Sequence, residues 1–324
     1  MTYKKALITG ANGFIGQVIT RHLEAKGVEV VGVDSHTGGR PGLFTGDIST
    51  LGDWQRAFTG CDLVIHTAAV VSNAVDADTT WRVNVLGTRN VIEAATAAGV
   101  KRLVHLSSVR AFSDVNFPDG VTERWPVRTD GNAYVDTKIA SEHVVLQAHA
   151  AGEIAVTIIR PGDVYGPGSR PWVVLPIEAM KSGSFALPAG GKGIFSPVYV
   201  DDLVTGLIQA AEHPAGAGQI LTLSGPRTTT TLEFFGHLHR MLGRSGNPKT
   251  VPMSLALLAS GIVAFIAKLR GVGTELNPTT IRYLARTGGY SSDKARAMVG
   301  YTPSVDLEEG MKRTEAWLRI QGLI

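Results

Sequence analysis

A tyrosine and a lysine, Tyr134 and Lys138, stand four residues apart at the start of a segment typical of a helix. Positions i and i+4 share one helix face, so both side chains would point to the same site. Oxidising an alcohol requires loss of the hydroxyl proton while a hydride leaves the carbon, and a tyrosine with a pKa of about 10 is a poor base at neutral pH. A neighbouring ammonium lowers that pKa. The spacing alone is common, so its position after an apolar strand ending in Ser107 and Ser108 is what indicates catalysis.

A glycine-rich loop, TGANGFIG, lies between the first apolar strand and the first helix. Gly10 permits a tight turn, Gly13 permits close approach to a pyrophosphate, and Gly16 lets helix and strand pack closely. The helix N-terminus offers N–H groups and a positive dipole to phosphates. Asp34 ends the next strand, where a carboxylate binds a ribose hydroxyl and repels a 2′-phosphate. The loop therefore predicts a dinucleotide site that takes NAD in preference to NADP, although Arg40 offers a partner for a 2′-phosphate.

The first half of the chain alternates strand and helix. Strands are expected at Lys5–Thr9, Val28–Asp34, Leu63–Thr67, Leu103–Ser107 and Val156–Arg160, and helices at Phe14–Lys26, around Trp81–Ala98 and at Tyr134–Ala150. Apolar strands separated by helices predict a parallel sheet covered on both faces. After residue 160 the chain is rich in Pro and Gly, and Gln219–Leu223 is typical of a returning strand. We therefore predict an α/β, doubly wound Rossmann-type fold. An NAD-binding domain would span 1–160 and 196–224, and a smaller, mainly helical substrate-binding lobe would span 161–195 and 225–324.

Composition narrows the class of protein. The 324 residues are 44% hydrophobic, which excludes a disordered chain, and a net charge of +3 argues against a nucleic-acid-binding protein. The single cysteine, Cys61, excludes an internal disulfide framework and fits a reducing compartment. With no signal peptide at the N-terminus, a cytoplasmic location is expected. The nine histidines show no ligand spacing and none pairs visibly with Cys61, so neither a metal nor a catalytic thiol is expected.

Several further motifs carry a resemblance to a known family. They are GDIST at 46–50, HTAA at 66–69, NVLGT at 84–88, YVDTK at 134–138, IIRPGDVYGPG at 158–168, SPVYVDDL at 196–203 and the C-terminal segment at 290–319. Together with the glycine loop, in this order, they resemble an extended short-chain dehydrogenase/reductase of the NAD-dependent epimerase/dehydratase family. The resemblance covers essentially the whole chain and is closest to 3β-hydroxysteroid dehydrogenase-like and dihydroflavonol reductase-like members.

The resemblance implies roles for individual residues. Catalysis would fall to Ser108, which positions the substrate oxygen, with Tyr134, Lys138 and a supporting Asn84. The cofactor would contact Gly10, Asn12, Gly13, Phe14, Ile15, Gly16, Asp34, Asp47, Ile48, Ala68, Ala69, Tyr134, Lys138, Pro161 and Gly162. Lys138 would bind the nicotinamide ribose and Asp47 the adenine amino group. Ser107 is the alternative to Ser108, and a simple capping role fits Ser107 better. Asp201 and Asp202 fit a helix N-cap and first turn.

Three activities compete. The first is an oxidoreductase acting on an apolar secondary alcohol or ketone, such as a hydroxysteroid. The second is a sugar-nucleotide epimerase or dehydratase, in which the hydride returns to the substrate. It needs a cationic grip on a diphosphate, for which Arg227, Arg282 and Arg286 are candidates, but Asp163 stands where such enzymes often carry Asn. The third is a non-catalytic NAD-binding sensor, which would have no need of Tyr134.

The C-terminal lobe raises a question about membranes. Residues 225–324 carry a net charge of +6, and the segment 251–269 is apolar but contains Pro, Ser and Gly. A spanning helix needs about 20 predominantly apolar residues, so the segment is borderline. We expect a helix buried within the lobe, with an interfacial helix as the less favoured alternative. The resemblance also implies a homodimer formed through the helices 81–98 and 134–150.

Overall fold

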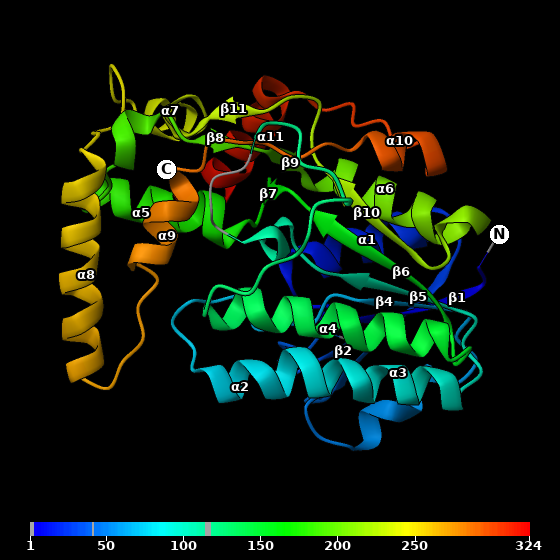
Figure 1. The fold of residues 1–324 in the computed structure, drawn as a ribbon. Coiled ribbons are helices and arrows are strands. Elements are labelled where there is room, and N and C mark those ends of the chain that lie inside the picture. Colours follow the sequence, from blue (N-terminus) through cyan, green and yellow to red (C-terminus); the bar gives the residue numbers. More distant parts are fainter. Residues whose placement is uncertain (1–2, 41, 114–117) are drawn as a thin grey trace.

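The computed structural model describes residues 3–40, 42–113 and 118–324 (Figure 1). Its centre is a seven-stranded parallel sheet with the strand order β10-β6-β5-β4-β1-β2-β3. The strands are β1 (Lys5–Thr9), β2 (Glu29–Asp34), β3 (Leu43–Thr45), β4 (Leu63–His66), β5 (Arg102–Leu106), β6 (Ala155–Pro161) and β10 (Gln219–Leu223). The chain moves from β1 to one side and then returns to β4 on the other. The carboxyl ends of β1 and β4 therefore form a topological switch point, where open α/β sheets bind ligands.

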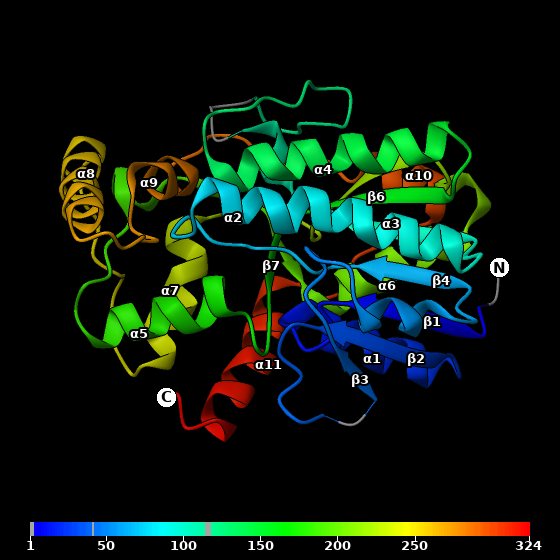
Figure 2. The same ribbon diagram turned by 90° about the horizontal axis from the view of Figure 1, so that it is seen from below.

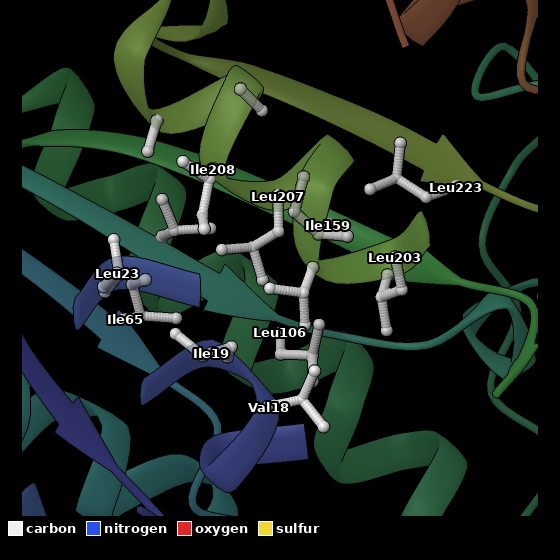
Figure 3. Packing of buried hydrophobic residues seen from close by; sticks show 14 of the residues in the cluster. Val18, Ile19, Leu23, Ile65, Leu106, Ile159, Leu203, Leu207, Ile208 and Leu223 are labelled. Carbon is white, nitrogen blue, oxygen red and sulfur yellow. The ribbon is translucent and has the colours of Figure 1, made fainter. Parts of the chain in front are cut away.

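Helices cover both faces of the sheet, as the alternation predicts. On one face lie α1 (Phe14–Ala25) and α6 (Val200–Glu212), and on the other lie α3 (Gly87–Ala97) and α4 (Ala133–Ala150) (Figures 1 and 2). Successive strand residues enter opposite cores: Ile8 packs on the α1 side and Leu7 on the α3 side. Figure 3 shows the first core, in which α1 and α6 side chains meet Ile65 and Leu106 of the sheet. The doubly wound Rossmann-type fold is thus confirmed.

Some element boundaries differ from expectation. The short edge strand β3 was not expected, because its three residues carry no periodic signal. The helix expected near Trp81–Ala98 begins earlier, with α2 (Ala77–Trp81), and reaches α3 through a π-helical turn at Arg82–Leu86. Asp76 explains the early start, because its carboxylate accepts a 2.8 Å hydrogen bond from the Thr79 amide and so caps α2.

The remaining chain forms a mainly helical lobe with its own core. Its helices are α5 (Leu175–Lys181), α7 (Thr231–Met241), α8 (Met253–Leu269), α9 (Pro278–Leu284) and α11 (Leu307–Ile320), and its strands pair as β7 (Asp163–Tyr165) with β9 (Pro197–Tyr199) and β8 (Ile194–Phe195) with β11 (Thr229–Thr230). Five aromatic residues dominate this core, namely Tyr165, Phe195, Tyr199, Phe234 and Phe235. α10 (Asp293–Val299) packs back on the α6 face of the sheet. Shorter 3₁₀ or π turns occur at Asp53–Phe58, Val109–Phe112, Arg170–Val174, Pro188–Gly191 and Pro214–Gly216.

The expectation that the helix at 251–269 is buried is wrong. α8 spans Met253–Leu269 at one end of the molecule, and its large apolar side chains are exposed: Leu258 is 62% exposed and Phe265 63%. The residues that α8 buries are small, namely Ala256, Ser260 and Ala267. In the described part of the chain, no helix is both long enough and apolar enough to cross a membrane.

Candidate active site

The glycine loop between β1 and α1 forms a close-packed turn. Gly10 has a φ of +71°, which favours glycine, and a Cβ there would lie 2.9 Å from the Ala68 backbone nitrogen. A Cβ on Gly16 would lie 2.2 Å from the Gly10 carbonyl oxygen, so only glycine lets the helix approach the strand this closely. Gly13 is the N-cap of α1 and has no side chain to bind the first amides of the helix. This open helix N-terminus fits a pyrophosphate group.

Asp34 lies beside this loop at the end of β2. Its carboxylate accepts hydrogen bonds from the Asn12 amide at 2.9 Å and the His36 amide at 3.0 Å. The bond to Asn12 fixes the carboxylate at the rim of the glycine loop, where it fits a ribose. Arg40 reaches the same rim, because its Nη1 donates to Asn12 Oδ1 at 3.2 Å.

The other predicted cofactor residues follow neighbouring strands at the same sheet edge. Ala68 and Ala69 follow β4, and the Ala68 amide donates to Thr9 Oγ1 at 3.3 Å. Pro161 ends β6, and the Gly162 amide donates to the Leu223 carbonyl at 2.9 Å. Two further pairs complete the set: Phe14 and Ile15 begin α1 and pack on the sheet core, while Asp47 and Ile48 follow β3.

Ser108 and Tyr134 meet at the carboxyl ends of the strands. Ser108 follows β5, and Tyr134 lies in the first turn of α4, which Asn132 caps by accepting a 3.1 Å hydrogen bond from the Val135 amide. The Ser108 hydroxyl lies close enough to the Tyr134 phenol to lower its pKa. Ser108 is also the N-cap of the turn Val109–Phe112 and accepts from the Arg110 amide at 3.1 Å.

Burial and two neighbours set the pKa of Tyr134. Burial has the largest effect and raises the pKa above its ordinary value, although the Ser108 hydroxyl and the positive charge of Arg110 lower it. Lys138 is not among the neighbours that lower it. Its ammonium donates a 2.7 Å hydrogen bond to the Leu106 carbonyl, and burial lowers the pKa of Lys138 to about 8. The sequence pattern predicts activation of the tyrosine by lysine and does not identify Arg110.

A buried ion pair behind the site was also missed. Both Glu142 carboxylate oxygens accept from Arg160, at 2.8 Å from Nε and 2.6 Å from Nη2, and the Ser107 hydroxyl donates to the same carboxylate at 2.5 Å. Ser107 thus holds Glu142, and the capping role expected for Ser107 falls to Ser108 instead. A signal was available in Glu142, which lies one helical turn after Lys138 on the same face of α4. Its partner Arg160, on β6, is not readable from local sequence.

Two buried histidines lie beneath Lys138. His66 Nδ1 lies 2.6 Å from Thr9 Oγ1 and its Nε2 lies 2.9 Å from Thr88 Oγ1, so both ring nitrogens have hydroxyl partners. Burial lowers the pKa of His66 to about 3, and burial and the Lys138 charge lower that of His105 well below its usual range. Both imidazoles are therefore neutral and polar supports of the strands.

Asn84 ties the loop after β4 to α4. Its Oδ1 accepts from the Val70 amide at 2.7 Å, and its Nδ2 donates to the Val70 carbonyl at 3.1 Å and to Thr137 Oγ1 at 3.0 Å. Because Thr137 lies in the same helical turn as Tyr134 and Lys138, Asn84 positions that turn without reaching the site itself.

Asp163 joins the sheet to the lobe. Its carboxylate accepts hydrogen bonds from Arg286, from the Tyr283 hydroxyl and, at 2.8 Å, from the Ser196 amide, all of them buried. Arg286 is therefore neutralised in the interior, while Arg227 pairs with Glu233 at 2.7 Å on the surface. Arg227 and Arg286 therefore do not form a joint binding site for a diphosphate.

Other residues singled out from sequence have structural roles. Asp201 and Asp202 lie in the first turn of α6, but the N-cap is Tyr199, so the capping expectation is wrong. Asp202 instead accepts from the amides of Ser304 and Val305. Burial raises the pKa of the Cys61 thiol to about 11, which makes it a poor nucleophile. Within residues 3–40, 42–113 and 118–324, no group of three or more His, Cys, Asp or Glu is arranged to hold a metal ion.

Comparison with known proteins identifies relatives across the whole chain. The NAD-dependent epimerase/dehydratase family matches residues 6–223. The bovine (Bos taurus) sterol-4-alpha-carboxylate 3-dehydrogenase, decarboxylating, is 31% identical, over 96% of this chain and 91% of its own length. The 2-alkyl-3-oxoalkanoate reductase of Stenotrophomonas maltophilia (strain K279a) is 30% identical, over 96% of this chain and 98% of its own.

A similar solved structure contains bound NAD. The UDP-glucose 4-epimerase of Thermus thermophilus in complex with NAD superimposes with a TM-score of 0.77 at 26% identity, covering 97% of this chain and 99% of that one. The NAD prediction is confirmed by the family and by such neighbours. The chain therefore belongs to the NAD-dependent epimerase/dehydratase family and is an NAD-dependent oxidoreductase of the extended short-chain dehydrogenase/reductase type.

Proposed function

We propose that Ser108, Tyr134 and Lys138 catalyse the interconversion of an apolar secondary alcohol and its ketone. The observation that carries this proposal is the arrangement of Ser108 at the end of β5 beside Tyr134 of α4, at the sheet edge next to the glycine loop and with Lys138 one helical turn away. Bound NAD supplies the hydride acceptor in oxidation and the donor in reduction.

The chain's own residues handle the proton and the orientation. In oxidation, Ser108 holds the substrate oxygen by a hydrogen bond, and the Tyr134 phenolate takes the hydroxyl proton as the C–H bond releases its hydride. In reduction, the Tyr134 phenol returns a proton to the ketone oxygen. Lys138 keeps a positive charge below the tyrosine at pH values under about 8, the pKa to which burial lowers it. Each turnover therefore moves one hydride and one proton, and Tyr134 carries the proton.

The main test is Tyr134→Phe. We expect kcat for an apolar ketone to fall about a thousandfold, because general acid–base catalysis contributes 10² to 10⁴ in rate. NADH absorbance follows turnover, and NADH fluorescence titration serves as the control, with an affinity within about twofold of the unchanged protein. A variant that keeps most of its turnover contradicts the mechanism. Wild-type protein that binds NADH but turns over no ketone supports the sensor, and interconversion of sugar nucleotides without net absorbance change supports the epimerase.

We further propose that the substrate carries a carboxylate near the reacting carbon. The compounds in the names of these two relatives, a sterol-4-alpha-carboxylate and a 2-alkyl-3-oxoalkanoate, each have an apolar part and a carboxylate, and each name places the oxidised or reduced group at carbon 3. Here the Arg110 guanidinium carbon lies 5.5 Å from the centroid of the Tyr134 ring and 4.9 Å from that of Tyr283, so a positive charge stands beside the reacting position. A charged hydrogen bond contributes about 1.5–3 kcal/mol.

Arg110→Met tests the carboxylate. We expect KM for a long-chain 3-oxo acid to rise at least about tenfold, because the variant loses a charged hydrogen bond worth about 1.5–3 kcal/mol. KM for the methyl ester should change less than about twofold. An equal rise for acid and ester would assign Arg110 to the pKa of Tyr134 or to folding instead.

The division into an NAD-binding domain (1–160 and 196–224) and a substrate-binding lobe (161–195 and 225–324) remains our proposal. The first pair of segments supplies the seven strands of the parallel sheet, and the second supplies most of the aromatic core, to which the first adds Tyr199. The packing of α10 against α6 adds one helix of the second pair to the sheet layer. We also propose a cytoplasmic location, which the single buried thiol supports.

We propose a homodimer formed through α2, α3 and α4. These helices lie side by side on one outer face (Figures 1 and 2), and α2 and the π turn expose Trp81 (46%) and Leu86 (49%). A second copy would cover this apolar surface. Sedimentation equilibrium should give twice the chain mass for the wild type and the single-chain mass for Trp81→Arg, and a monomeric wild type excludes the dimer.

A further inference from the structure

The outward face of α8 is built from large apolar side chains. Leu255, Leu258, Ile262, Phe265, Ile266 and Leu269 are between 42% and 71% exposed. At 3.6 residues per turn, these six positions form one stripe roughly 100° wide. The opposite face buries only Ala256, Ser260 and Ala267. An ordinary surface helix turns its large apolar residues toward the core, and α8 has the reverse arrangement. Such an exposed apolar stripe indicates that α8 contacts an apolar partner outside the lobe.

The charges around α8 are positive. No charged residue occurs between Met253 and Ala267, and Lys268 and Arg270 close the helix at its C-terminal end. Across residues 244–282 there are five Lys or Arg and a single acidic residue, Glu275, whose carboxylate accepts a hydrogen bond from the Asn73 amide. An apolar stripe bordered by basic residues is complementary to an anionic lipid surface.

The position of α8 suits contact with a flat surface. It lies along one end of the molecule, opposite the start of β1, in both views (Figures 1 and 2). Exposed apolar residues continue past the helix at Val272 (58%) and Leu276 (47%). A second copy docking on this stripe would bring two basic segments together, so like charges disfavour that occupant.

We infer that α8 lies on the surface of an anionic bilayer. The stripe enters the boundary between headgroups and acyl chains, and Lys268 and Arg270 contact the anionic headgroups. The 17-residue helix lies in the membrane plane rather than across it.

The contact places the bilayer next to the lobe that faces the active site. α8 packs on α9, and α9 carries Tyr283, which contacts Arg110 and Asp163. An apolar substrate dissolved in the bilayer would thus reach the site without crossing water. This route rests on the proposed function, whereas binding of the bilayer by α8 does not.

Vesicle flotation of the full chain tests the inference. At low salt we expect the wild type to bind vesicles containing phosphatidylglycerol at least about tenfold better than pure phosphatidylcholine vesicles, because basic residues near an anionic surface each contribute about 1 kcal/mol. The variant Leu258→Ser/Phe265→Ser/Leu269→Ser should lose binding to both. The matched control is Leu51→Ser, which changes a residue that is 69% exposed away from α8 and should bind like the wild type.

Further measurements make each outcome decisive. Lys268→Glu/Arg270→Glu keeps the stripe and should remove the preference for anionic vesicles, and it tests the inference even if the triple variant misfolds. Turnover of a water-soluble ketone without vesicles should stay unchanged in both variants, which separates failure of this inference from failure of the proposed function. Equal vesicle binding by wild type and both variants, no binding by the wild type, or a wild-type dimer that only the triple variant abolishes would each overturn it.

Discussion

Helices α1 and α8 both carry large apolar side chains, but α1 buries them and α8 exposes them. In α1, Ile19 and Leu23 are 0% and 1% exposed, whereas in α8 Phe265 and Leu269 are 63% and 71% exposed. The apolar residues of α1 recur at helical spacing and form one face, and the other face is polar. That apolar face packs against the sheet (Figure 3). α8 has no charged face, so its sequence does not say which side turns inward.

The partners of the two helices decide the difference. α1 packs on strands whose side chains leave space for Val18, Ile19 and Leu23. α8 packs against α9 and the turn Pro188–Gly191 through small residues. Small side chains allow close contact between helix backbones, so the large residues of α8 are left outside. Hydrophobicity therefore indicates the core only where the period of the pattern selects one face.

Truncating one large side chain in each helix gives the largest expected contrast. Ile19→Ala should lower the free energy of unfolding by about 2–5 kcal/mol, because it opens a cavity in the core. Leu258→Ala should change it by less than about 0.5 kcal/mol, because the side chain is already in solvent. Urea unfolding measures both. A loss above about 2 kcal/mol for Leu258→Ala would mean that the stripe packs against protein.

A glycine in each helix gives a second contrast between the packed α1 and the exposed α8. Gly16→Ala in α1 should weaken NADH binding about a hundredfold, or about 2.7 kcal/mol, because its Cβ would lie 2.2 Å from a backbone oxygen that cannot move aside. The matched control is Gly261→Ala in α8, where a Cβ meets nothing within 4 Å. That change should leave binding intact and stabilise the helix by about 0.5–1 kcal/mol. Fluorescence titration measures the affinities, and tight binding by Gly16→Ala would mean that the loop adopts another conformation.

The interior on the α3 side of the sheet should also respond to pH, unlike the surface at α8. His66 has a folded pKa of about 3, so below its ordinary value of 6.5 the unfolded chain binds a proton that the folded chain does not. Stability should therefore fall as pH drops from about 6.5 toward 3. Between pH 7 and pH 5 the histidine accounts for about 2 kcal/mol.

His66→Gln tests this contribution, because the amide can still bond Thr9 and Thr88. The loss of stability between pH 7 and pH 5 should be about 2 kcal/mol smaller in the variant than in the wild type. Leu258→Ser, on α8, should leave the wild-type pH dependence unchanged. Equal pH dependence in wild type and His66→Gln would show that His66 is protonated in the folded chain.

Much of the candidate site is readable from local sequence. The glycine spacing, Asp34 and the pair Tyr134 and Lys138 depend on neighbours within one turn or one strand–helix unit. By contrast, Glu142 with Arg160, and Asp163 with Arg286, are ion pairs between distant segments, and no periodicity reports them. Arg110 was missed for the same reason, since its relation to Tyr134 depends on how the turn after β5 faces α4.

The sequence by itself determined the parallel α/β fold, the NAD loop and the helix face shared by Tyr134 and Lys138, because these follow from repeat patterns and from short-range backbone geometry. Only the tertiary structure decided that Ser108 rather than Ser107 caps the turn and meets the tyrosine, that Asp163 neutralises Arg286, and that α8 turns its large residues outward. Each of these depends on which surfaces meet across the fold, and contacts between distant segments leave no periodic trace in the chain.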